Sequence, residues 1–269
     1  MLPQLPIEAP IQSSNSRSIL SAFVIERGPA HILGPFMLHT ETEARRRGVA
    51  LEFCNAKELA SANRANTANW RPLMPNCHPA YGVTTPENSI NVIGRNAKGE
   101  VVAANSIVRY DWRATDYIEE TESLRLLYAD PTSMRQSGEK CVVTAAMARE
   151  ITGIVAFSGA AWLRPDYRGL GLAQLMPRFI KACAAARWQL DWIFGMMAED
   201  IYRRGHSKHF GFDREEWELK WFNSIWGGNY RLAVLWTNLE GLAADLSTVL
   251  AGQQAPAEID SRVLSRNAQ

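Results

Sequence analysis

The segment that most constrains the fold is residues 152–188, where a strand-like run passes through a proline and two glycines into a helix. Residues 152–163 (TGIVAFSGAAWL) are apolar without helical spacing and stop before Pro165, which is typical of a central strand. Residues 170–188 predict an amphipathic helix. Its apolar stripe consists of Leu172, Leu175 or Met176, Phe179 and Cys183. Pro177 lies inside this helix and should kink it, at a cost of about 3 kcal/mol unless packing absorbs it.

The rest of the chain supplies further strands and helices. The clearest pattern is 89–112, where two alternating β-branched runs flank a turn ending at Gly99, which predicts a hairpin. Other strands are predicted at 19–28, 49–55, 190–197 and 230–239. Other helices are predicted at 36–48, at 56–70, in the first part of 113–140, at 142–151 and, as a short helix, at 198–211. The stretch 217–226 fits a helix or a strand equally well. Strands that alternate with helices predict an α/β fold around one sheet.

Composition narrows the class of protein. The 269 residues are 46% hydrophobic and 21% charged, as in ordinary soluble proteins, and carry a net charge of +1, so we expect no nucleic-acid partner. The basic stretch 43–48 is interpreted as a solvated helix end. Residues 1–18 lack the pattern of a signal peptide and are expected to be a loose arm. No apolar run approaches the roughly 20 residues of a membrane span, so we expect a cytoplasmic protein without a membrane partner.

The cysteines give no sign of a metal site. Cys54, Cys77, Cys141 and Cys183 show neither metal-ligand nor C-x-x-C spacing. We interpret them as buried or incidental thiols in a reducing compartment and expect no bound metal.

The glycine turn at 168–173 has the properties of an anion site. A strand that enters a helix leaves the first backbone N–H groups of the helix without partners, and the helix dipole favours negative charge there. Gly169 and Gly171 let a bulky anion approach the backbone, and Arg168 adds a forked positive donor. A pyrophosphate fits this description. Gln174 breaks the dinucleotide-binding glycine pattern, and the lysine of a phosphate-binding P-loop is missing.

Arg168-x-x-Gly171-x-Ala173 resembles the acyl-CoA-binding motif of the GNAT superfamily of acyl-CoA N-acyltransferases, Arg/Gln-x-x-Gly-x-Gly/Ala. The lead-in WLRPDYRGLG is also similar to that family. A second likeness is HFGFD (209–213), which resembles the Gly-Phe signature that follows the short helix after the next strand. The resemblance covers roughly 49–237.

The resemblance implies a GNAT-type α/β fold, with a central mixed, mostly antiparallel sheet flanked by helices. It implies an N-acetyltransferase that uses acetyl-CoA, without a metal, to acylate the amine of a small molecule or peptide. In that family the fourth and fifth strands splay apart, and pantetheine pairs with the fourth. The residues implied to bind coenzyme A are Ala161, Trp162, Leu163, Arg168, Gly169, Leu170, Gly171, Leu172 and Ala173.

The catalytic residues of the family are harder to assign to positions of this sequence. The family's frequent thiolate-protonating tyrosine lies four residues before the Gly of Gly-Phe, where this chain has Ser207. Tyr202, His206 and His209 follow one another at helical spacing, and Tyr202 and His206 are the candidates to act in its place. Asp111 and Glu199 are candidate general bases, and a water chain is the alternative to both.

Three regions are expected: an N-terminal extension of strand and helix at 1–48, a GNAT-type domain at 49–240 with an insertion at 113–150, and a C-terminal helix with a polar tail at 241–269. The sequence does not name the acceptor. Six of the nine tryptophans follow residue 187 and could line an acceptor pocket or form a large core or dimer surface, so a homodimer stays open. Two other functions also stay open: an acyl-CoA sensor without catalysis and an acyltransferase for longer chains.

Overall fold

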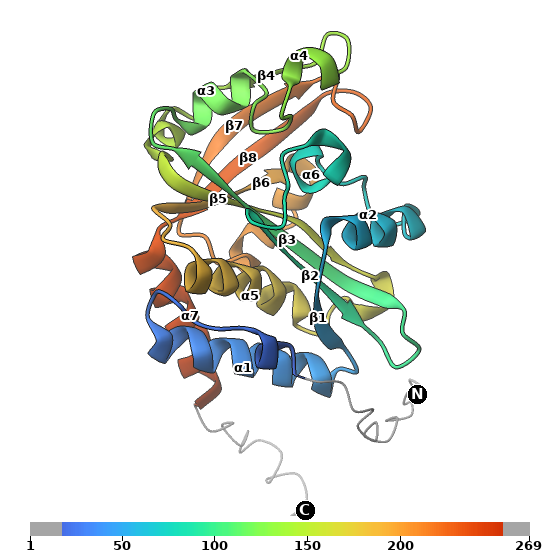
Figure 1. Ribbon diagram of the computed structural model, residues 1–269, viewed down its shortest axis with the longest axis vertical. Coiled ribbons are helices and arrows are strands. Elements are labelled where there is room, and N and C mark those ends of the chain that lie inside the picture. The colour runs from blue at the N-terminus through green and yellow to red at the C-terminus, as the bar shows by residue number, and fades with distance from the viewer. Residues whose placement is uncertain (1–17, 255–269) are drawn as a thin grey trace, which may run out of the picture.

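The computed structural model describes residues 18–254, so the predictions for the N-terminal arm and for the tail from Ala255 lie outside the described residues. Within this range one eight-stranded sheet carries helices on both faces, in the order β1-β2-β3-β5-β6-β8-β7-β4 (Figure 1). The strands are β1 (Ala50–Cys54), β2 (Ser89–Arg95), β3 (Val101–Trp112), β4 (Lys140–Val143), β5 (Gly153–Leu163), β6 (Trp192–Ala198), β7 (Arg214–Phe222) and β8 (Tyr230–Thr237). All neighbouring strands pair antiparallel except β5 and β6. The predicted α/β class and the hairpin at 89–112 are confirmed.

Helices cover the two faces of the sheet unequally. The α-helices are α1 (Ala30–Arg46), α2 (Ala56–Ala65), α3 (Tyr117–Glu122), α4 (Pro131–Met134), α5 (Leu172–Arg187), α6 (Glu199–Tyr202) and α7 (Leu239–Gln254). The 3-10 helices are η1 (Ile19–Ala22), η2 (Pro75–Cys77), η3 (Pro79–Tyr81), η4 (Ala146–Glu150), η5 (Pro165–Tyr167) and η6 (His206–His209). Figure 1 shows α1, α5 and α7 side by side on one face, and α2 and α3 belong to the hydrophobic cluster of the other.

Helix α5 is more apolar than a surface helix because other elements pack against it on several sides. Its predicted stripe packs on the sheet, and α1 and α7 contact its other sides, so that 13 of its 16 residues are buried. The helix runs unbroken through Pro177, and α1 likewise runs through Pro35. A proline removes one hydrogen bond from a helix, and burial against neighbouring elements offsets that loss.

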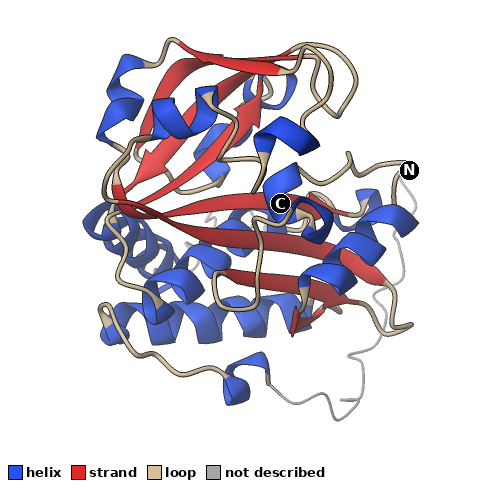
Figure 2. Ribbon diagram, turned by 45° about the horizontal axis from the view of Figure 1, so that its top comes forward, coloured by secondary structure: helices blue, strands red, loops and turns tan. Residues whose placement is uncertain are grey.

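The sheet opens between its two parallel strands. β5 and β6 pair only from Val155 to Phe157 on β5 and from Trp192 to Phe194 on β6, so residues 158–163 have no partner on that side. Figure 2 shows the strands converging at one side and separating into two groups toward the other. The resemblance implied such a splay.

Three predicted elements differ from the structure, and one stretch left open between helix and strand is resolved. Residues 19–28 form η1 and a coil, because the N–H groups of Glu26 and Arg27 donate to the Ala186 carbonyl at the end of α5 instead of to a strand. The predicted helix at 142–151 is the end of β4 followed by η4, because β4 pairs with β7. The helix predicted at 198–211 is broken at Gly205, and 217–226 contains strand β7.

The described part of the chain holds no helix that is both long and apolar enough to cross a membrane. Its four cysteines are free thiols; Cys77, Cys141 and Cys183 are buried and Cys54 is half-buried, in line with their interpretation as buried thiols. Burial raises the pKa of the Cys54 and Cys77 thiols to about 12, so both stay protonated at neutral pH.

Candidate acyl-CoA site

The open turn, residues 168–173, leaves the start of α5 accessible. Gly169 and Gly171 have φ values of +78° and +82°, a left-handed conformation that costs other residues roughly 1–2 kcal/mol. Gly171 is the N-cap of α5, and no side chain caps the helix. A Cβ added to Gly169 would meet no atom within 4 Å. The turn therefore offers backbone donors and free space, the two things that a bound anion requires.

Two arginines stand beside the open turn. Arg168 is exposed, and its Nε donates to the Leu163 carbonyl at 3.2 Å, at the end of β5. Arg47, which follows the last residue of α1, donates from Nε to the Leu170 carbonyl, and its Nη2 lies 3.6 Å from the position of a Cβ on Gly171. Sequence reasoning missed Arg47, because 43–48 read as a solvated helix end and nothing local links it to a turn 123 residues later.

The exposed edge of β5 carries a bulge. Trp162 pairs with Ala104 and Gly159 with Ser106, so two residues of β5, Ala160 and Ala161, stand opposite one residue of β3. Ala160 has a φ of +54°, a strained conformation for a residue with a side chain. Ala161 is exposed although β5 lies in the middle of the sheet. The bulge therefore lies in the part of β5 that has no partner on the β6 side.

Trp162 and Leu163 offer backbone to this gap rather than side chains. The Trp162 ring stacks on Trp70, with ring centroids 4.6 Å apart and planes 5° apart. Its Nε1 donates to the side-chain oxygen of Asn69 at 3.1 Å. Because the indole is buried in the hydrophobic cluster on the face opposite α5, only the main chain of Trp162 is available to a ligand.

The second sequence motif, residues 209–213, forms a turn that we call the packed turn. Side chains of α5 and α7 bind it. Arg178 donates to the His209 carbonyl at 2.6 Å and forms a two-pronged ion pair with Asp245. The buried Lys181 donates to the Phe210 carbonyl at 2.7 Å and to the Gly211 carbonyl. Burial lowers the pKa of Lys181 to about 7.

The glycine of the packed turn has no space around it. Gly211 has a φ of +64°, and a Cβ added there would lie 2.3 Å from the Asp245 carboxylate and 2.9 Å from Arg178. The Phe212 ring lies 3.1 Å from the position of a Cβ on Gly195 of β6, so Gly195 leaves room for the ring beside the gap. The Gly-Phe pair therefore packs against β6, α5 and α7.

The candidate proton-transfer residues are divided by Gly205. Its φ of +78° ends the first helical turn, so Tyr202 does not share a helix face with His206 and His209 as expected. The Tyr202 hydroxyl donates to Glu215 at 2.5 Å, and this hydrogen bond raises the pKa of the phenol. The His206 and His209 rings are 5.9 Å apart, and His209 Nδ1 lies 3.3 Å from Gln174 Nε2, in the first turn of α5.

A depression of about 480 Å³ lies between this segment and the start of β7, where Arg214 and Glu215 form part of its wall. Tyr202, Ser207 and Phe212 line it. Ser207, at the position where the resemblance expects tyrosine, thus faces the same space as the Tyr202 phenol.

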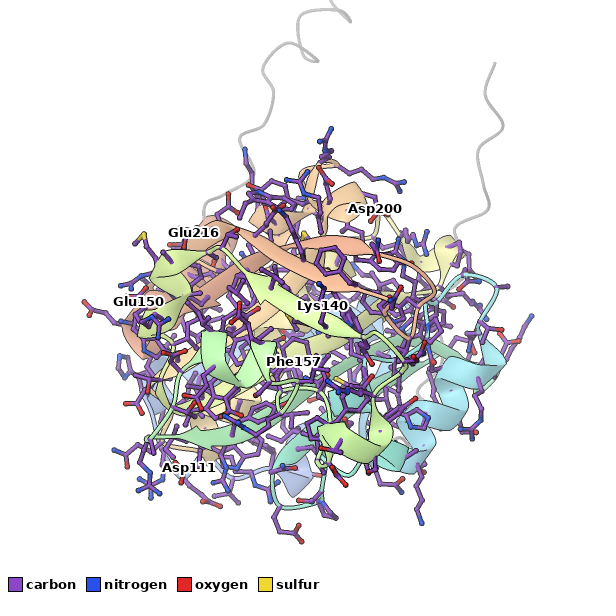
Figure 3. The ribbon with its side chains drawn as sticks, turned by 90° about the horizontal axis from the view of Figure 1, so that it is seen from above. Asp111, Lys140, Glu150, Phe157, Asp200 and Glu216 are labelled. Atoms are coloured by element: carbon purple, nitrogen blue, oxygen red, sulfur yellow. The ribbon has the colours of Figure 1, made fainter. Side chains whose placement is uncertain are left out.

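The two candidate general bases lie far apart. Asp111 pairs across β3 and β5 with Ile154, which is about 30 Å along the strand from Leu163. It is exposed, and hydrogen bonding from Arg113 lowers its pKa to about 2. Glu199 follows β6 directly and adjoins Asp200, and Figure 3 shows Asp111 and Asp200 on opposite sides of the molecule. Of the two, only Glu199 lies at the end of β6 that borders the gap.

No family model matches the sequence, and no curated protein sequence matches it at a significant level. Solved structures similar to this chain include a variant of the spermidine N-acetyltransferase SpeG from Vibrio cholerae, with 12% identity, 73% of this chain and 96% of that chain covered, and a TM-score of 0.42. They also include the aminoglycoside acetyltransferase AAC(6')-Ib in complex with coenzyme A and kanamycin, with 14% identity, 73% and 98% covered, and a TM-score of 0.40.

Identities and scores this low do not define the fold by themselves, but the strand order and connections do. The parallel pair β5–β6 splays apart, α5 starts at the mouth of the splay, and β7 and β8 complete a mostly antiparallel sheet. The fold is of the GNAT type. To it this chain adds β4 at the edge beyond β7, and α1 and α7 beside α5.

Proposed function

We propose that this protein is an acyl-CoA-dependent N-acyltransferase, which transfers acetyl from acetyl-CoA to a primary amine by direct attack in a ternary complex. One observation carries the proposal: an uncapped glycine turn with open space and two arginines lies at the mouth of a gap in the sheet. A pyrophosphate on the turn places the rest of an extended coenzyme A beside the unpaired edge of β5.

The proposed roles of the binding residues follow from their chemistry. The N–H groups of 169–173 would hold the pyrophosphate, and Arg168 and Arg47 would neutralise its charge. Main-chain groups of 161–163 would pair with the pantetheine amides, as the resemblance implies. We assign polarisation of the thioester carbonyl to a main-chain N–H at the bulge around Ala160, in the part of β5 without a partner on the β6 side.

The chemistry requires two proton movements. One proton must leave the ammonium before its nitrogen can attack; as the nitrogen then bonds to the acyl carbon and the carbon–sulfur bond breaks, the nitrogen loses a second proton and the thiolate gains one. We assign thiolate protonation to Tyr202 or His206. The raised pKa of Tyr202 keeps its phenol protonated at neutral pH, so it can act as an acid and not as a base. The candidates to accept the proton of the amine are a water chain and Glu199, which hydrogen bonds from Arg203 and Arg231 hold at the end of β6.

Two measurements test the proposal. Isothermal titration should show saturable binding of acetyl-CoA, and a thiol assay should then show release of coenzyme A when an amine panel is added. Binding without thiol release across amines would support a sensor instead. If neither acetyl-CoA nor a longer acyl-CoA binds, the proposal is wrong. Tighter binding of long-chain acyl-CoA than of acetyl-CoA would reassign the acyl group.

A further inference from the structure

A second pocket, of about 540 Å³, lies at the end of β6. Its wall includes Arg71, Glu199, Asp200, Arg203, Tyr230 and Arg231. Ala198, the last residue of β6, also lines it and belongs to the hydrophobic cluster that contains Trp162. Ala160 of the bulge and Tyr230 pack against that same cluster. Because β6 pairs with β5 only as far as Phe194, Ala198 lies beyond the paired stretch, and the pocket lies on the β6 side of the gap.

The carboxylates of this pocket are already occupied by arginines. Glu199 accepts hydrogen bonds from Arg203 at 2.6 Å and from Arg231 at 3.0 Å. Asp200 accepts one from Arg71 at 3.0 Å. Arg231 also pairs with Glu218, to which Lys220 is paired as well. With these two neighbours included, four cationic side chains face three carboxylates, which leaves one positive charge at the pocket.

Several guanidinium donors are left over. Among residues 18–254, Arg71 donates only from Nη2, Arg203 from Nε and Nη2, and Arg231 from Nε and Nη1. Each arginine therefore keeps at least one N–H nitrogen without a protein acceptor. A carboxylate is the partner that such a fork binds best.

Arg71 is held in place by aromatic rings. Its guanidinium carbon lies 5.8 Å from the Trp226 ring centroid and 5.6 Å from that of Tyr230. Trp226 in turn donates from Nε1 to the Pro72 carbonyl at 2.8 Å. A guanidinium fixed in this way loses less conformational entropy when it binds an anion.

We infer that this pocket binds the acceptor, and that the acceptor carries a carboxylate in addition to its amine, as an amino acid or a short peptide does. The inference rests on the proposed function. The surplus positive charge matches the single negative charge of one carboxylate. The same charge repels polycations such as polyamines, and the carboxylates that could attract a polyamine are already paired with arginine. Arg71 binds the carboxylate and leaves the amine free to point toward the bulge.

The test compares amines that differ only in the carboxylate. With saturating acetyl-CoA, kcat/KM for thiol release is measured for amino acids and short peptides, for their C-terminal amides, and for spermidine. We expect the free carboxylates to exceed their amides by about tenfold or more, because a charged hydrogen bond contributes roughly 1.5–3 kcal/mol. Arg71→Gln should reduce that ratio to near unity and leave acetyl-CoA affinity unchanged. Arg113→Gln, which removes an exposed arginine at the distant end of β3, is the matched control and should keep the ratio.

A preference for the amides or for spermidine overturns the inference, and so does an Arg71→Gln variant that keeps the wild-type ratio. If the protein binds acetyl-CoA but releases no thiol with any of the carboxylate-bearing amines, the inference is overturned as well. Failure to bind acetyl-CoA instead contradicts the proposed function.

Discussion

The open turn and the packed turn both centre on glycines with positive φ, yet their surroundings are opposite. A Cβ on Gly169 would meet nothing within 4 Å, whereas one on Gly211 would lie 2.3 Å from Asp245. The start of α5 at the open turn has no side-chain cap, while Arg178 and Lys181 bind the carbonyls of the packed turn. The two motifs that resemble one family therefore differ in kind: the first leaves room for a ligand, and the second fixes the architecture around it.

The largest effect that separates the turns is on stability. Gly211→Ala should lower the free energy of unfolding by about 3 kcal/mol, because it adds a left-handed alanine and a clash with Asp245. Gly99→Ala is the matched control: its φ is also positive, at +78°, but its added Cβ meets no atom within 4 Å, so only the backbone cost of roughly 1–2 kcal/mol applies. Urea unfolding measures both variants. Equal losses would show that the packed turn is not packed as described.

The packed turn should also give the protein a pH dependence. The folded pKa of Lys181, about 7, lies below its ordinary 10.5, so between these values the unfolded chain holds the proton that the folded chain has lost. Stability therefore rises with pH over this window, and below pH 7 the cost of burying the charge is fully present. Relative to Lys181→Met, the wild type should gain about 2 kcal/mol between pH 7 and pH 9. Thermal unfolding at several pH values measures this difference, and parallel curves would contradict it.

The open turn should be sensitive in binding rather than in stability. Gly169→Ala should weaken acetyl-CoA binding by about tenfold, because the methyl group occupies space needed by the pyrophosphate. Its loss of stability should match that of Gly99→Ala, since both glycines have a φ of +78° and free surroundings. Titration calorimetry and unfolding on the same samples separate the two effects. Unchanged affinity for acetyl-CoA would contradict the proposal that its pyrophosphate binds at the open turn.

The same contrast explains what could be predicted from the sequence. The open turn depends on local signals, namely a strand that ends before Pro165, two glycines and an amphipathic helix, and all three were found. The packing around Gly211 depends on Asp245 of α7, and Arg47, directly after α1, contacts the open turn. No local pattern connects either residue to its turn. The helix predicted at 142–151 was wrong for a similar reason, since pairing with β7 overrides local propensity there.

Pro35 and Gly205 show the limits of local rules in both directions. Pro35 directly precedes the helix predicted at 36–48, but α1 already begins at Ala30 and runs through Pro35, and Phe36 and Met37 are buried. Gly205 signalled a doubtful helix, and the structure does break there. The shared face of Tyr202 and His206 depended on that helix and therefore failed, while their catalytic roles stay predictions.

The most direct test of the central claim, that coenzyme A binds at the open turn, is acetyl-CoA titration of a pair of variants. Arg168→Glu reverses the charge beside the turn, and Pro177→Ala restores a hydrogen bond deeper in α5 without changing its first turn. We expect Arg168→Glu to weaken binding by about 30-fold or more, and Pro177→Ala to change it by less than about twofold. Equal effects of the two substitutions, or wild-type affinity in Arg168→Glu, would contradict the account.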